Sequence, residues 1–273
     1  MIKGILSNSL RRLGLLGAID HIRYRILKFR ERHRNRRFRM EHPDVALPPD
    51  DLMYETFRMD YAKYYHDSAR TAEWLIGLLE KHVELEEVRI LDWGCGPGRI
   101  IRHLPRLLGN GCSYHGTDYN PRIIQWCREH LPGIAFNLNG EHAELPYPDQ
   151  HFDVIYGISI FTHLAEPSHH AWYAELMRVL RPGGIMLQTA QGDAFKDRLT
   201  KDELRRYNAG ELVVRGDVKE GHRLFSAFHP PAYMRKMFKD AEILDHIPDP
   251  GSQDVWIIRR PSPSASHTKA PPA

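Results

Sequence analysis

The chain has 273 residues, enough for one large domain or two small ones, and 42% of them are hydrophobic. Its three cysteines, Cys95, Cys112 and Cys127, have spacings that fit neither a set of disulfides nor a metal site. No apolar run reaches the roughly 18 residues of a membrane-spanning helix, and no segment has the pattern of a secretory signal. We therefore expect a cytoplasmic α/β protein without a bound metal, and disulfide-rich and membrane-spanning classes are excluded.

Positive charge is concentrated near the N-terminus. The formal net charge of +3 divides into +10 over residues 1–40 and −7 over the remainder. Apolar residues recur in this segment at spacings of three and four, which predicts a basic amphipathic helix: Leu15, Ile19, Ile22, Ile26 and Phe29. Three uses remain open, namely packing on the domain or a partner protein, peripheral contact with an anionic membrane, and, less favoured, nucleic-acid binding.

A proline-rich linker, residues 41–51, separates this extension from the main domain, expected over residues 52–260. Residues 52–87 form a predicted helical cap with one long helix over 61–82. Four tyrosines in this cap are candidates to line an acceptor pocket, with simple packing as the alternative: Tyr54, Tyr61, Tyr64 and Tyr65.

The most informative segment is residues 88–100, where an apolar run ends at Asp92 and a glycine-rich loop follows. This pattern predicts a strand, a tight loop and a helix N-terminus, with a ligand lying against the backbone. The spacing is G-x-G-x-G and not the G-x-G-x-x-G of dinucleotide-binding proteins. Asp92 would repel a pyrophosphate but could pair with an ammonium group.

A second carboxylate follows 20 residues after Gly98. Residues 113–118 form a predicted strand that ends at Asp118, where a carboxylate can accept both ribose hydroxyls of an adenosine. Tyr119 comes next, and the pair Asn120-Pro121 is typical of a helix start, with contact to the ligand as the alternative.

These motifs, followed by "FNLNGEHAELPYPDQHFDVIYGISIFTHL" (136–164) and "ELMRVLRPGGIMLQT" (175–189), resemble in order those of the class I S-adenosylmethionine (AdoMet) methyltransferases. The resemblance begins with "LDWGCGPGR" (91–99) and implies AdoMet as the cofactor. It implies that Asp92 and the loop residues Gly94, Cys95, Gly96 and Gly98 hold the methionine part, and that Asp118 and Tyr119 lie at the ribose. Glu141 and His142 would lie at the adenine, although Asp is the usual residue at position 141. Gly157 and Ser159, at the end of the strand over 152–156, would complete the site.

The resemblance also implies a seven-stranded, doubly wound sheet of order 3-2-1-4-5-7-6, with strand 7 antiparallel and helices on both faces. The remaining pieces are a substrate-side insertion over 191–229, a helix over 230–239, strands over 242–247 and 254–259, and a disordered tail over 261–273.

The expected chemistry is methyl transfer to a small-molecule or glycan-type acceptor, at oxygen or nitrogen. His163, just beyond strand 4, is the candidate catalytic base, with local packing as its alternative role. Two other functions fit parts of the pattern. An inactive AdoMet-binding scaffold would keep every motif, and an NAD-dependent oxidoreductase would share the first strand, loop and carboxylate.

Overall fold

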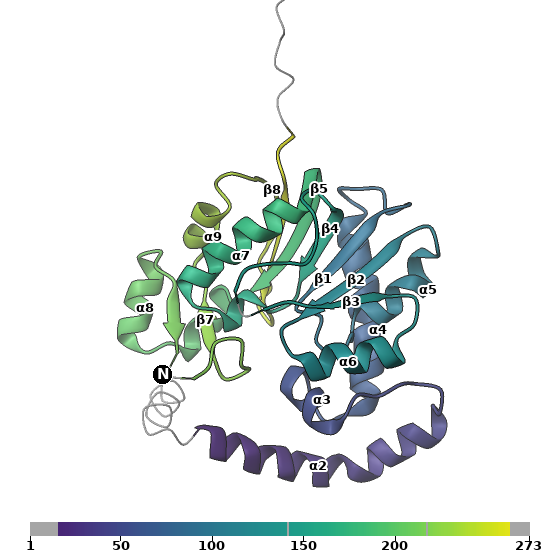
Figure 1. The fold of residues 1–273 in the computed structure, drawn as a ribbon. Helices are drawn as coiled ribbons and strands as arrows, with labels where there is room; N and C mark the ends of the chain where they lie inside the picture. The colour runs from purple at the N-terminus through teal and green to yellow at the C-terminus, as the bar shows by residue number, and fades with distance from the viewer. Residues whose placement is uncertain (1–15, 141, 217, 263–273) are drawn as a thin grey trace, which may run out of the picture.

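The computed structural model describes residues 16–140, 142–216 and 218–262. Its centre is a seven-stranded sheet of order β3-β2-β1-β4-β5-β9-β8 (Figure 1). The strands are β1 (Arg89–Trp93), β2 (Ser113–Asp118), β3 (Ala135–Leu138), β4 (Phe152–Gly157), β5 (Leu180–Ala190), β8 (Glu242–Ile247) and β9 (Asp254–Arg259). All neighbours pair in parallel except β9, which is antiparallel to both β5 and β8. The predicted sheet order is confirmed, because β6 and β7 form a separate small sheet.

Helices cover both faces of this sheet because successive strand residues point to opposite sides. In β1, Ile90 belongs to one buried cluster and Leu91 to the other. The Ile90 cluster is completed by α4 (Tyr61–Leu79), α5 (Leu104–Leu108) and α6 (Pro121–His130), and the Leu91 cluster by α7 (Glu166–Val179) and α9 (Pro231–Met237). The expected helix start at Asn120-Pro121 is confirmed, since the Asn120 side chain accepts a hydrogen bond of 3.0 Å from Arg122 N.

The Pro-Gly-Gly segment, residues 182–184, lies inside β5. Phe152 pairs with Leu180 and Val154 pairs with Ile185, so residues 181–184 bulge out between two paired positions. Gly183 has a φ of +75°, which a residue with a side chain rarely adopts. The segment is therefore an irregularity within the strand.

The insertion after β5 folds into a small unit at one end of the sheet. It consists of η3 (Asp193–Arg198), α8 (Lys201–Asn208), β6 (Val213–Arg215) and β7 (Ser226–Phe228). Thr200 and Glu203 form a capping box that fixes the start of α8. Two short 3-10 helices, η1 (Ile101–His103) and η2 (Phe161–His163), follow the ends of β1 and β4.

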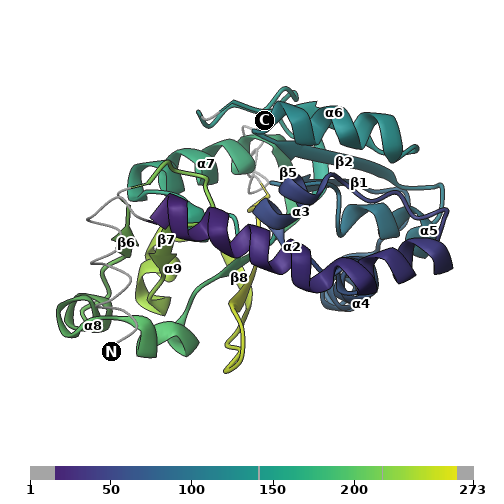
Figure 2. The same cartoon turned by 90° about the horizontal axis from the view of Figure 1, so that it is seen from below.

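The N-terminal helix α2 (Leu16–Glu41) runs across α3 (Asp50–Thr56) and α4 on the outside of the fold (Figure 2). One of the three uses left open for the apolar stripe, packing on the domain, is not the one that the structure shows. Ile19, Ile22, Ile26 and Phe29 are 43 to 66% exposed, and Leu15 lies outside the described residues.

The face of α2 that packs on the domain carries Glu31, Asn35 and Phe38, which are buried. Asn35 donates to Met59 O at 2.7 Å and accepts from Tyr61 N at 3.0 Å. The buried face of α2 is therefore marked by the hydrogen bonds of a polar side chain. Hydrophobic periodicity does not detect such bonds. Within the described residues, no helix combines the length and apolar character needed to cross a bilayer.

Candidate active site

A cavity of about 480 Å³ opens at the carboxyl ends of the central strands. Its floor comes from the ends of β1 and β2 and from the segments that follow β3 and β4. Two segments distant in sequence cover it, the end of α3 with Glu55 and Thr56, and the loop with Glu220, Gly221 and Arg223. Ligands of open α/β sheets bind at this edge.

The glycine loop after β1 is held from both sides. Gly94, Gly96 and Gly98 have φ values of +72°, +52° and +64°, a conformation that side chains disfavour. The Tyr64 hydroxyl donates to Pro97 O at 3.0 Å. A Cβ added at Gly96 would lie 3.2 Å from the Thr56 methyl group, so α3 rests directly on the loop.

Asp118 is a buried carboxylate whose two oxygens are both fixed. Gly96 N donates to Oδ2 at 3.0 Å and Asn120 N donates to Oδ1 at 2.9 Å. Burial raises the pKa of Asp118 to about 6, against the opposing effect of these backbone hydrogen bonds. Each oxygen keeps a second acceptor site for a ligand hydroxyl.

Asp92, which is buried, and Arg99, which is partly buried, give the wall a charged group of each sign. Asp92 is 3% exposed, and burial raises its pKa to about 7. Burial lowers the pKa of Arg99, whose guanidinium lies 4.6 Å from the centre of the Phe57 ring. Both residues line the cavity. A zwitterion would offer each of them an opposite charge, which relieves the cost of burying charge.

The structure brings most of the site residues expected from the sequence onto one wall: Asp92, Gly94, Cys95, Gly96, Asp118, Tyr119, His142, Ser159 and His163. Two are not among the lining residues. Gly98 packs beside Leu131, and a Cβ on Gly157 would collide with Gln188 and Trp93, so close packing accounts for both glycines. Glu141 lies outside the described residues.

Ser159 has a strained backbone at the cavity wall, with a φ of +67°. Its N–H donates to Thr189 Oγ1 at 2.8 Å, and its hydroxyl accepts from Gln253 Nε2 at 2.7 Å. Strain of this kind persists only where the surroundings over-determine it and is frequent at functional sites.

His163 lies in the wall as a neutral imidazole. Burial lowers its pKa, and Nδ1 is 2.9 Å from Phe225 O. Because a carbonyl only accepts, we assign the proton to Nδ1, which leaves Nε2 as the basic nitrogen. The same residue's carbonyl accepts from Gly221 N at 2.8 Å, so His163 also anchors the covering loop.

The cap tyrosines do not line this cavity, which corrects the pocket-lining expectation. Tyr61 and Tyr64 are buried in a cluster with Met53 and Phe38, and Tyr54 faces α2. Tyr65 packs against that cluster. Packing within the cap and against α2, with a hydrogen bond from Tyr64 to the glycine loop and one from Tyr54 to Asp20, accounts for their positions.

Several lining residues were not singled out from the sequence. Those from the cover are Glu55, Thr56, Glu220, Gly221 and Arg223, which lie in no motif, and Trp172 comes from α7. Asn139, Ile160 and Leu164 lie within the motif over 136–164, which gave them no particular role. The Oδ1 of Asn139 is buried without a hydrogen-bond partner, and the residue lines the cavity. No group of three or more potential metal ligands occurs in the part of the chain that the structure describes.

The wall therefore fits AdoMet. Asp92 and Arg99 complement the amino and carboxyl groups of a zwitterion, Asp118 can accept from a ribose, and Asn139 offers an acceptor to an adenine amino group. The fold and site together define a class I methyltransferase.

Comparisons with known proteins agree with this class. Residues 90–184 match the family model described as a methyltransferase domain. The chain is 34% identical over 203 residues to phthiotriol/phenolphthiotriol dimycocerosates methyltransferase 1 of Mycobacterium ulcerans, covering 69% of each chain. It is 33% identical over 154 residues to a fatty-acid O-methyltransferase of Mycolicibacterium smegmatis, covering 55% of this chain and 49% of the relative.

Solved structures share the fold at low identity. A Pyrococcus horikoshii protein matches with a TM-score of 0.55 and 18% identity, over 72% of this chain and 95% of that one. The chain belongs to the AdoMet-dependent class I methyltransferases, and its cofactor is AdoMet. Nothing in these comparisons supports an oxidoreductase or an inactive scaffold.

Proposed function

We propose that this enzyme methylates an oxygen atom of a lipid-like small molecule while α2 rests on an anionic membrane surface. The observation that carries the proposal is a cavity whose lining combines charged, hydrogen-bonding side chains with apolar ones. The first group suits the cofactor, and the second group suits an acceptor with a hydrocarbon portion.

For the cofactor, we assign Asp92 to the amino group, Arg99 to the carboxyl group and Asp118 to the ribose hydroxyls. Tyr119, Asn139 and His142 lie where the adenosine end would follow. When bound, the sulfonium group supplies an electrophilic methyl, so these residues need only bind and orient it.

On the acceptor side, the wall is formed by aliphatic side chains and one indole, from Ile158, Ile160, Leu164 and Trp172. Such a surface favours a hydrocarbon chain over the many hydroxyls of a glycan, because each buried hydroxyl needs a partner. The names of the two relatives, a methyltransferase of phthiotriol dimycocerosates and a fatty-acid O-methyltransferase, support a lipid acceptor. A glycan acceptor has no comparable support.

We assign to His163 the removal of the acceptor proton. Its lowered pKa keeps the imidazole neutral at physiological pH, and the hydrogen bond to Phe225 O leaves Nε2 free to accept that proton. For an acceptor that is already ionised, such as a carboxylate, His163 would instead only help to position it.

The test is incorporation of labelled methyl from AdoMet into two acceptor pools, long-chain fatty acids and long-chain alcohols. We expect methylated lipid with the wild-type enzyme, and at least about tenfold less with Asp118→Ala when AdoMet is not saturating. No incorporation into either pool, with S-adenosylhomocysteine still bound, would refute the lipid acceptor.

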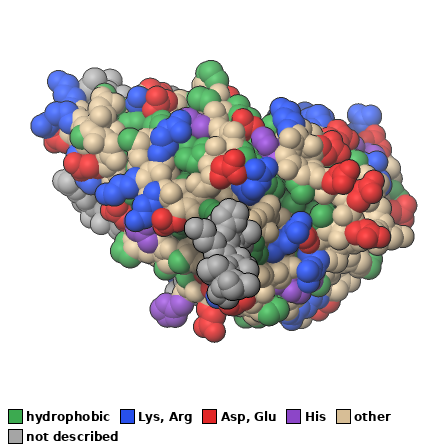
Figure 3. Space-filling model, turned by 90° about the horizontal axis from the view of Figure 1, so that it is seen from above, with side chains coloured by type: hydrophobic (Ala, Val, Ile, Leu, Met, Phe, Trp, Pro, Cys, Tyr) green, Lys and Arg blue, Asp and Glu red, His purple; other side chains and the backbone are tan. Residues whose placement is uncertain are grey.

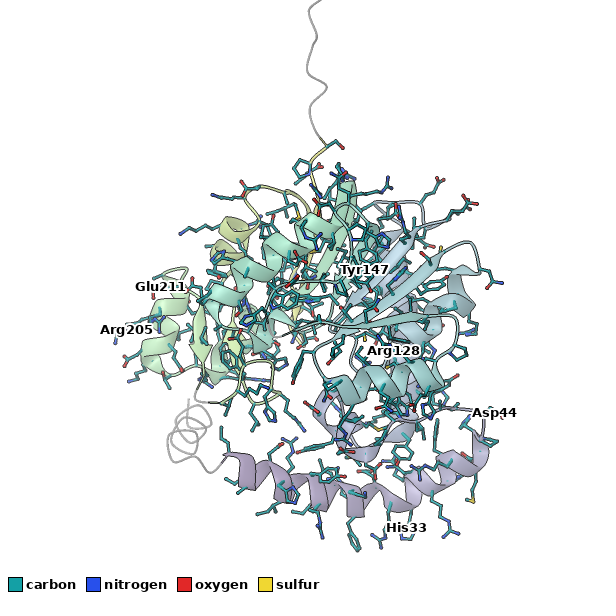
Figure 4. The ribbon with its side chains drawn as sticks, in the orientation of Figure 1. His33, Asp44, Arg128, Tyr147, Arg205 and Glu211 are labelled. Carbon is teal, nitrogen blue, oxygen red and sulfur yellow. The ribbon has the colours of Figure 1, made fainter. Side chains whose placement is uncertain are left out.

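The membrane contact rests on the outward face of α2. The exposed Ile19, Ile22, Ile26 and Phe29 form a strip, and helical spacing places arginines on both sides of it, among them Arg25, Arg30, Arg36 and Arg37. His33 points away from the body of the fold on this same side (Figure 4). By contrast, the opposite side of the molecule intersperses acidic and basic side chains (Figure 3). A basic helix with an apolar strip can lie in the interface of anionic lipid.

Sedimentation with vesicles tests this contact. We expect binding to vesicles of equal parts phosphatidylglycerol and phosphatidylcholine, and little binding to phosphatidylcholine alone. The double variant Ile22→Ser/Phe29→Ser should bind at least about tenfold more weakly, since each buried apolar side chain contributes about 1.5–3 kcal/mol. Trp74→Ser/Leu138→Ser, which removes two other exposed apolar side chains, is the matched control. Equal losses in both double variants would refute the assignment to α2.

A further inference from the structure

A second cavity lies between α2 and the cap, with a volume of about 320 Å³. Six basic side chains line it against two acidic ones. The basic residues are Arg23, Arg30 and Arg34 of α2, Arg58 before α4, Lys63 of α4, and Arg223 of the covering loop.

The two carboxylates in this wall already form ion pairs or hydrogen bonds with neighbouring residues. Glu31 lies 2.9 Å from Arg30 Nε and 3.5 Å from Arg34 Nη1. Asp60 Oδ1 accepts from Lys63 N at 3.0 Å and caps α4, while its Oδ2 lies 3.7 Å from Arg34. No ion pair within the described residues involves Arg23, Arg58 or the Lys63 ammonium, so a net positive charge faces the cavity.

Arg223 connects this basic cavity to the active site, because it lines both. Its guanidinium stacks 4.0 Å from the centre of the Tyr54 ring, and Nη1 donates to Tyr54 O at 2.8 Å. Asp20 Oδ1 lies 3.9 Å from the same nitrogen. These contacts fix the plane of the guanidinium and leave further N–H groups to donate.

We propose that the basic cavity binds a phosphate group of the acceptor, whose remaining part reaches past Arg223 into the active site. Phosphate is the anion that suits it, since arginines bind phosphate oxygens in pairs and a lysine adds a point charge. The identification of this ligand as the acceptor rests on the proposed function above. The acceptor would then be a phosphorylated amphiphile, with its phosphate beside the membrane-facing helix and its methylated atom in the cavity.

Calorimetric titration of the full chain tests the site without requiring turnover. One probe is dihexanoyl phosphatidate below its micelle concentration, and the other is inorganic phosphate. Arg58→Gln/Lys63→Gln should weaken phosphatidate binding at least tenfold. Lys81→Gln/Arg106→Gln removes the same charges from exposed positions outside both cavities and should change the affinity by less than twofold. Arg223→Gln should also weaken phosphatidate binding.

Titration of each variant with S-adenosylhomocysteine checks the fold and the cofactor site separately. Failure of the proposed function is recognised by a different result, the absence of methyl incorporation into lipid, which these titrations do not measure. Tighter binding of phosphatidate than of inorganic phosphate would assign the site to a lipid head group. Equal affinities would support a site for phosphate itself, from a soluble ester. The proposal is overturned if the wild type binds neither probe, or if both double variants lose affinity equally.

Discussion

Cofactor affinity should fall steeply as the pH is lowered from 8 to 6, because two buried carboxylates in the site have raised pKa values. Burial raises the pKa of Asp92 to about 7 and that of Asp118 to about 6 in the ligand-free protein. In the proposed site the cofactor's ammonium and ribose hydroxyls would pair with the ionised carboxylates. Protonation therefore opposes binding, and the affinity decreases with decreasing pH.

The size of the effect follows from the two pKa values. Asp92 is about nine-tenths ionised at pH 8 and about one-eleventh ionised at pH 6, which is about a tenfold difference. Asp118 contributes about a further twofold, since it is about half ionised at pH 6. The combined loss is about 20-fold, or about 1.8 kcal/mol, if the ligand keeps both groups ionised.

The assay is calorimetric titration with S-adenosylhomocysteine at pH 6, 7 and 8, with the wild type and Asp92→Asn. The variant should bind more weakly at pH 8 and should retain only the roughly twofold dependence of Asp118. A wild-type affinity that is constant across this range would refute the reasoning, because either the pKa values are not raised or these carboxylates do not contact the ligand.

Three further changes have defined outcomes. Asp118→Ala should weaken S-adenosylhomocysteine binding by about 1.5–3 kcal/mol, the contribution of hydrogen bonds to a charged group, and an unchanged calorimetric affinity would remove Asp118 from the site. His163→Gln should lower kcat for a hydroxyl acceptor by about 10²–10⁴ while cofactor affinity is retained, and an unchanged kcat would leave His163 as an anchor of the covering loop. Thr200→Ala removes the capping box of α8 and should reduce the free energy of unfolding by about 0.5–2 kcal/mol in denaturant titration, whereas no change would mean that this end of α8 contributes little to stability.

Short sequence patterns predicted the strands, strand ends and helix starts that are determined by neighbouring residues in the chain. The strand ends at Asp92 and Asp118, the helix start at Asn120 and the last two strands, over 242–247 and 254–259, all follow from short patterns of apolar, glycine and capping residues. Asp92 and the glycine loop belong to β1 and its end, and Asp118 ends the neighbouring strand β2, so the pairing of these two strands brings them together.

The cover of the site could not be predicted because it is assembled from distant segments. Thr56 lies against the glycine loop and Arg223 lines the same cavity because α3 and the insertion fold over the sheet edge, and neither residue lies in a recognisable motif. The orientation of α2 could not be predicted for a related reason. Hydrophobic periodicity identifies the apolar face, but the partners of Asn35, Met59 O and Tyr61 N, lie in the segment before α4 and at its start.

The contacts of Asp20, Tyr54 and Arg223 have a practical consequence for work with this enzyme. Removing the basic N-terminal segment would be a natural step to improve purification, but a cut after Asp20 deletes an acceptor of the Tyr54 hydroxyl. The loop held by Arg223 would then lose part of its support at the edge of the active site. Shortened versions intended for crystallisation or assay should therefore begin before Leu16.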